Sequence, residues 1–139
     1  MTAEQALAAL LEAEHQAIYA YGVLGARLGH GARPLALDGY DAHRVARDAL
    51  LVQLRRRGLP TPGPAAAYAL QIATSAAAAR EALRVEEAVA VRCRDLIGAT
   101  DDKDLRGLGL RGLTSCAVRA TQWRQAMGLT PTVPMPGEP

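Results

Sequence analysis

Apolar residues recur in alternating steps of three and four along four stretches of this chain, and this period constrains its fold more than any other feature. In the first stretch the repeating positions are Leu7, Leu11, Glu14, Ile18, Tyr21 and Gly25. Such steps mark one face of an α-helix, whereas a strand would alternate at every second residue, and no segment does so. The pattern therefore predicts an all-helical chain.

Capping and breaking residues mark the ends of each predicted helix. Thr2, with Gln5 three residues later, has the spacing of a capping box, and a glycine follows each stretch. The predicted helices extend from Thr2 to about Leu28, from Pro34 or Asp38 to Gly58, from Thr74 or Ser75 to about Ile97, and from Asp101 or Asp102 to Met127. Gly107, Gly109 and Gly112 weaken the last helix or, alternatively, let a neighbouring helix approach it closely.

The segment between the second and third predicted helices cannot be a regular helix, because it contains Pro60, Pro62 and Pro64. We therefore expect a single domain over residues 1–139, an all-α, ferritin-like four-helix bundle in which a long proline-rich crossover joins two antiparallel helix hairpins. A plain up-down-up-down bundle is the alternative, and the length of the crossover argues against it. The proline-rich C-terminal tail, residues 128–139, is expected to be loose or to lie on the surface.

The composition limits the core, the partners and the compartment. Half of the residues are hydrophobic but none is Phe, so Ala, Leu and Val must form a core of closely packed helices. The net charge of +2 comes from interleaved basic and acidic residues, and no basic stripe indicates nucleic-acid binding. No apolar run approaches the roughly 18 residues that a membrane span needs, and the start lacks the basic region of a signal peptide. Two cysteines are too few for a secreted disulfide scaffold, so we expect a cytoplasmic protein.

Several short motifs carry a resemblance to a known group of proteins. They are Glu14–Gly22 (EHQAIYAYG), His43–Leu50 (HRVARDAL), Pro64–Leu70 (PAAAYAL), Glu86 or Glu87, Trp123-Arg124 and Pro136-Gly137. Together they resemble a family of small ferritin-like domains of unknown function from GC-rich bacteria. The resemblance covers nearly the whole chain and implies a fold, but it implies no activity.

A ferritin-like di-iron centre needs a carboxylate from each of two helices and a Glu-x-x-His pair from each of the other two. Glu14 and Glu86 occupy core positions of the first and third helices and supply half of that pattern. Arg44 and Arg47 stand where the second helix should carry Glu and His, and His43 is about one turn off the level of Glu14. The fourth helix has no His and no acid beyond its first turn. The sequence therefore indicates a degenerate di-iron site and no bound cofactor.

The same positions predict a polar network in the core. A buried carboxylate needs a partner, and Arg44 or Arg47 is placed to give Glu14 a bidentate ion pair. The expected network comprises Glu14, His15, His43, Arg44, Arg47, Asp48 and Glu86. If a metal binds, the ligands to expect are Glu14, His43 and Glu86, and the ion is iron or manganese.

The other reactive or aromatic side chains are assigned to the core. Cys93 and Cys116 are several residues out of step across the predicted turn between their helices, too far apart for a disulfide. Tyr19 and Tyr21 are predicted to be core or interface aromatics, and Trp123 is predicted to fill the core near the end of its helix.

These observations favour a non-catalytic interaction or assembly module, expected to form a homodimer and to bind neither nucleic acid nor membranes. Two alternatives remain open. One is a metal-binding ferritin-like oxidoreductase that uses iron or manganese. The other is a protein that binds a small anion in the pocket of the vestigial site, with Arg44 and Arg47 reaching the ligand.

Overall fold

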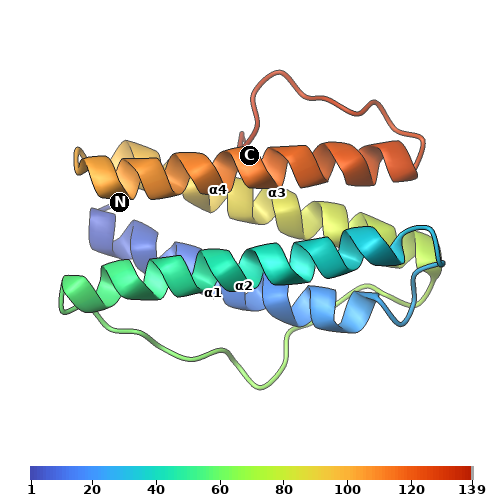
Figure 1. Ribbon diagram of the computed structural model, residues 1–139, viewed down its shortest axis with the longest axis horizontal. Coiled ribbons are helices and arrows are strands. Elements are labelled where there is room, and N and C mark those ends of the chain that lie inside the picture. The colour runs from blue at the N-terminus through green and yellow to red at the C-terminus, as the bar shows by residue number, and fades with distance from the viewer. Residues whose placement is uncertain (139) are drawn as a thin grey trace.

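A computed structural model describes residues 1–138 of the chain and shows four helices packed as a bundle (Figure 1). They are α1 (Ala3–Leu24), α2 (Arg33–Arg56), α3 (Ser75–Ala99) and α4 (Lys103–Ala126). None of the described residues lies in a strand, so the predicted fold class is confirmed. Within the described part of the chain, no helix has an apolar stretch long enough to cross a membrane.

The connectivity is two antiparallel hairpins joined by one long crossover. In Figure 1, α1 and α2 run in opposite directions, as do α3 and α4, and residues 57–74 return along the length of the bundle. As a result α2 and α3 run in the same direction. Each helix packs against two others: α1 contacts α2 and α3, and α4 contacts α3 and α2. The α2–α4 pair packs most loosely, which leaves one face of the bundle more open than the others.

The helix ends follow the local chemistry of the sequence. Thr2 and Gln5 form the predicted capping box, with the Gln5 backbone N–H donating to Thr2 Oγ1 at 3.2 Å. The side chains of Thr74 and Asp102 cap α3 and α4. The predicted end of the first helix at Leu28 is wrong: the α-helix ends at Leu24, and the chain continues in tighter turns. Glycines in this segment disfavour further helix, and the turns return Leu28 to the core.

Alanine, leucine and valine form most of the core, as the absence of Phe predicted. The glycines of α4 explain how closely α3 approaches it. A Cβ at Gly112 would lie 2.6 Å from Cys93 Sγ, and a Cβ at Gly109 would lie 2.8 Å from Ile97 Cγ1. Two interpretations of these glycines were open, a weakened helix or the close approach of a neighbouring helix, and the contacts support the second.

The two long irregular segments lie against the helices. In the crossover, the ring of Tyr68 packs edge-on against Tyr19, with ring centroids 5.5 Å apart. The tail folds back over α3 and α4 after the end of α4 (Figure 1). There, Arg124 donates to the carbonyl oxygen of Pro131 at 3.5 Å, and Gly137 lies beside Ala90 and Arg94. The described part of the tail thus lies on the surface of the bundle.

Candidate functional site

Polar side chains from all four helices meet in the middle of the apolar core. On α1, Glu14 falls on the same face as Leu7 and Tyr21, and only 3% of its surface is exposed. On α2, His43 is fully buried and directs Nδ1 at Glu14 Oε2 over 2.7 Å. The imidazole Nε2 lies 3.1 Å from Oε1 of Glu86, which is fully buried on α3. One histidine thus lies between two buried carboxylates.

Glu86 is the centre of this cluster, because a single oxygen atom accepts three hydrogen bonds. Besides His43, Glu86 Oε1 accepts the Tyr21 hydroxyl at 2.6 Å and Arg119 Nε at 2.8 Å. The Tyr21 hydroxyl in turn accepts the indole N–H of Trp123 at 2.8 Å. The second carboxylate oxygen, Glu86 Oε2, is buried and has no hydrogen-bond partner among the described residues.

The four charged groups balance one another. Both ring nitrogens of His43 face carboxylate oxygens, so both carry hydrogen and the ring is an imidazolium. Burial alone would lower the pKa of His43, but its hydrogen bonds to Glu14 and Glu86 outweigh burial and raise it to about 9. Burial would likewise raise the pKa of Glu86, yet His43 and Arg119 lower it to about 2. Two carboxylates and two cations give a cluster with no net charge.

The neutral members of the cluster keep their protons. Burial, followed by the charge of Glu86, raises the pKa of the Tyr21 hydroxyl far above its ordinary value. Burial also raises the pKa of the Cys93 thiol to about 12 and that of Cys116 well above its ordinary value. Gly39 on α2 provides the space for the tyrosine ring, since a Cβ there would lie 2.6 Å from Tyr21 Cε1.

The structure brings together three of the seven residues expected in the network, namely Glu14, His43 and Glu86. The predicted arginine partners of Glu14 are wrong. Arg44 lies on the surface over the ring of Tyr40, 5.2 Å from its centroid, and Arg47 pairs with its neighbour Asp48 at 2.8 Å. His43 was predicted to lie about one helical turn away from Glu14 along the bundle, and this prediction is wrong, because the two side chains face each other. As a result Arg44 and Arg47 point away from the core, and so does Asp48.

His15 also lies outside the cluster, although it is adjacent to Glu14 in the sequence. It is buried, and its Nε2 lies 3.0 Å from the carbonyl oxygen of Pro62. This contact holds the crossover against α1. The structure also does not support Arg44 and Arg47 as the residues of an anion pocket. A cavity between α2 and α4 is lined by Glu14, Arg111 and Arg119, but not by Arg44 or Arg47.

The sequence pattern did not predict that three further residues of the site form hydrogen bonds within it. Tyr21 and Trp123 were assigned to the core, where they lie, but they also link through hydrogen bonds to Glu86. Arg119 was not singled out at all. A signal was present, because Arg119 lies three residues after Cys116 and one before Ala120, next to a stripe otherwise made of core residues.

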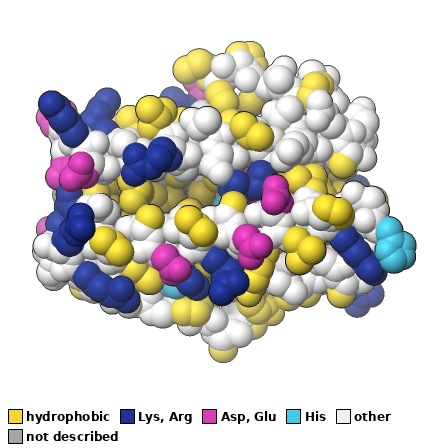
Figure 2. Space-filling view, in the orientation of Figure 1, with side chains coloured by type: hydrophobic (Ala, Val, Ile, Leu, Met, Phe, Trp, Pro, Cys, Tyr) yellow, Lys and Arg dark blue, Asp and Glu magenta, His cyan; other side chains and the backbone are white. Residues whose placement is uncertain are grey.

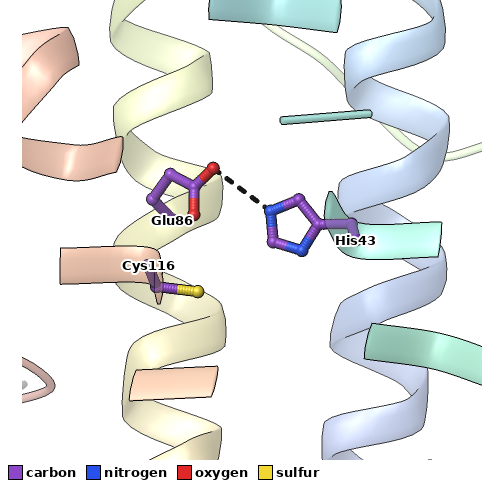
Figure 3. Close-up of side chains that lie close together, drawn as sticks. All are labelled: His43, Glu86 and Cys116. Carbon is purple, nitrogen blue, oxygen red and sulfur yellow. Dashed lines mark hydrogen bonds and ion pairs between the residues drawn. The ribbon is translucent and has the colours of Figure 1, made fainter. Parts of the chain in front are cut away.

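The donors of the cluster do not fit a di-iron centre. Such a centre needs bridging and terminal carboxylates from all four helices, but α2 contributes only His43 and α4 contributes Arg119 and Cys116. A smaller constellation does exist. One ligand atom each of His43, Glu86 and Cys116 lies within 4.8 Å of the others, and Figure 3 shows the three side chains converging from three helices. All three are buried.

Comparison with known proteins identifies the family. Residues 6–139 match the family described as a domain of unknown function, DUF4439, and the chain therefore belongs to it. A crystal structure of a conserved hypothetical protein, rv2844, from Mycobacterium tuberculosis resembles this chain with a TM-score of 0.87 and 35% sequence identity. The similarity covers 96% of each chain. No curated protein matches. These comparisons establish the family and the fold and name no activity.

Proposed function

We propose that this member of the DUF4439 family is a non-catalytic assembly module that pairs with a second copy of itself through the face formed by α2 and α4. One observation carries the proposal. Among the described residues, every large hydrophobic side chain that is exposed on a helix lies on one of these two helices. They are Leu37, Val45, Val52, Leu110 and Val118. The helices α1 and α3 expose none.

The open face is also hollowed. A cavity of about 490 Å³ lies between α2 and α4, with Val45, Ala46 and Ala49 on one side and Leu108 on the other. Figure 2, which views the molecule from this side, shows apolar side chains along both helices and a hollow between them. A concave apolar face next to protruding apolar side chains is suited to receive the same face of another molecule.

The size and charge of the face favour a second copy as the occupant. A helix of 24 residues is about 36 Å long, and a helix pair about 20 Å wide offers about 700 Å², close to the roughly 800 Å² per partner of a stable interface. Asp38 and Asp41 on α2 stand opposite Arg111 on α4 across the groove. A two-fold axis that runs along the groove would place the acidic edge on α2 of each copy against the basic edge on α4 of its partner.

The buried cluster supports a structural rather than a catalytic role for the core. Its charges are neutralised internally by His43 and Arg119, and its hydrogen bonds join all four helices. We interpret Glu14 and Glu86 as the remnant of a ferritin-like metal site, and we place the protein in the cytoplasm, where the two buried thiols would stay reduced.

Sedimentation equilibrium tests the assembly. The wild-type chain is expected to be a dimer at micromolar concentration, and Val45→Glu is expected to make it monomeric while leaving its helical circular dichroism unchanged. Ala8→Glu, on the exposed surface of α1, is the matched control and should remain dimeric. A wild-type chain that is monomeric up to about 100 µM, a concentration at which even weak specific dimers form, would refute the proposal.

A further inference from the structure

The arrangement of His43, Glu86 and Cys116 has the features of a site for a single metal ion. On each of the first two side chains, one polar atom is held in place by neighbouring groups. His43 Nδ1–H donates to Glu14 Oε2, and Glu86 Oε1 accepts from Tyr21 and Arg119 as well as from His43 Nε2–H, a contact that a metal ion on Nε2 would replace. A metal-binding histidine is typically oriented by a carboxylate in this way, and a metal-binding carboxylate by further donors.

Two of the atoms that face the centre have partners, since His43 Nε2–H donates to Glu86 Oε1 at 3.1 Å and Cys116 Sγ accepts from Arg119 Nη2 at 3.7 Å. The second oxygen of Glu86 is different. Glu86 Oε2 is buried without a hydrogen-bond partner among the described residues, and such an oxygen is costly unless a cation or a donor reaches it. Figure 3 shows this oxygen on the side of Cys116, with the cysteine sulfur and the His43 ring facing the same space. Imidazole nitrogen, thiolate sulfur and carboxylate oxygen are together the ligand set of Zn²⁺.

We propose that the chain binds one zinc-class divalent cation through His43 Nε2, Glu86 Oε2 and Cys116 Sγ, with Glu14 as the positioning residue that orients His43. One ligand atom from each of the three residues lies within 4.8 Å of the others, whereas ligands of a tetrahedral zinc ion lie about 3.5 Å apart. The side chains must therefore draw together by up to about 1.3 Å. This proposal is independent of the α2–α4 face.

Charge balance permits the ion to enter this buried site. The ion displaces the proton on His43 Nε2 and the proton of the Cys116 thiol, so two positive charges leave as two enter. Glu14 and Glu86 stay ionised and Arg119 stays protonated, and the cluster remains neutral. Glu86 and Cys116 also line a cavity of about 760 Å³ beneath the C-terminal tail.

Cobalt(II) is the probe, because a cobalt–thiolate bond absorbs in the near ultraviolet and four-coordinate cobalt absorbs in the visible. Chelator-treated protein, kept reduced by a phosphine, is titrated with cobalt and then with zinc. We expect both absorptions to saturate at one cobalt per chain, two protons to be released per ion, and zinc to abolish the absorption.

Two buried thiols provide a matched pair of variants. Cys116→Ser should lose the near-ultraviolet charge-transfer absorption of the cobalt–thiolate bond. Cys93→Ser, which changes the buried thiol on α3, should keep it. His43→Gln should weaken cobalt binding at least 10-fold, and circular dichroism establishes that each variant is folded. A wild-type titration without charge-transfer absorption would overturn the proposal, and so would an absorption that survives Cys116→Ser or disappears with Cys93→Ser.

Discussion

Replacing Tyr21 by Phe removes one oxygen atom from the core, and that atom serves two neighbours. It donates to Glu86 Oε1 and accepts from Trp123 Nε1. A hydrogen bond to a charged acceptor contributes about 1.5–3 kcal/mol, and a buried N–H left without an acceptor costs about 1–3 kcal/mol. Glu86 keeps His43 and Arg119 as donors, so we expect Tyr21→Phe to destabilise the protein by about 3–5 kcal/mol.

That loss is large against the total stability of a domain, which is about 5–15 kcal/mol. For a chain of this length it corresponds to a fall in Tm of about 3 °C per kcal/mol, or about 10 °C or more. Thermal melting and urea unfolding measure it. Tyr19→Phe is the matched control, because Tyr19 lies two residues away on the same helix and its hydroxyl makes no hydrogen bond among the described residues.

A double-mutant cycle isolates the indole contact. Trp123→Phe removes the N–H that Tyr21→Phe leaves without an acceptor, so the two losses should fall short of additivity by about 1–2 kcal/mol. Should Tyr21→Phe melt within about 0.5 kcal/mol of Tyr19→Phe, a difference typical of sites without such features, the hydroxyl does not connect the two residues and the described network is incorrect.

Two further predictions concern pH and packing. In metal-free protein, charging of His43 stabilises the fold fully below its ordinary pKa of 6.5, and this contribution is lost as pH rises through about 9; that of Glu86 is present above 4.5 and lost as pH falls towards about 2. Urea unfolding should therefore show maximal stability between about pH 4.5 and 6.5, and stability still rising towards pH 9 would contradict the imidazolium. Gly39→Ala should cost about 1–3 kcal/mol, because its Cβ would meet the Tyr21 ring, whereas Gly98→Ala, with nothing within 4 Å, should stabilise by up to about 1 kcal/mol. Equal melting of these two variants would show that Tyr21 does not pack on Gly39.

Local features of the sequence predicted the helices well, because helix formation depends on residues within a few positions of one another. The capping box at Thr2 and the cap at Asp102 are where they were expected, and the prolines of the crossover exclude a helix between Gly58 and Ser75. The predicted boundary at Leu28 is wrong because the sequence places the helix stop at Gly29 and Gly31, whereas the α-helix ends at Leu24, directly before Gly25.

Which side chains meet across the bundle was predicted less well. The core positions of Glu14 and Glu86 followed from the stripe, but their partners depend on how each helix is rotated and shifted along its axis. One turn is only about 5.4 Å, and the length of the irregular connection at residues 25–32 does not fix that shift. The prediction that Arg44 or Arg47 pairs with Glu14 is therefore wrong, and the observed partner of Glu14 is His43.

The sequence by itself determined that this chain forms four amphipathic helices with acidic residues inside, because periodicity and capping are local properties of a helix. The tertiary structure alone decided that one histidine lies between two carboxylates, that Arg119 and Tyr21 bond to the same oxygen as its Nε2, and that Cys116 faces the remaining one. Those contacts join residues on four different helices, and only the packing of the helices sets their distances.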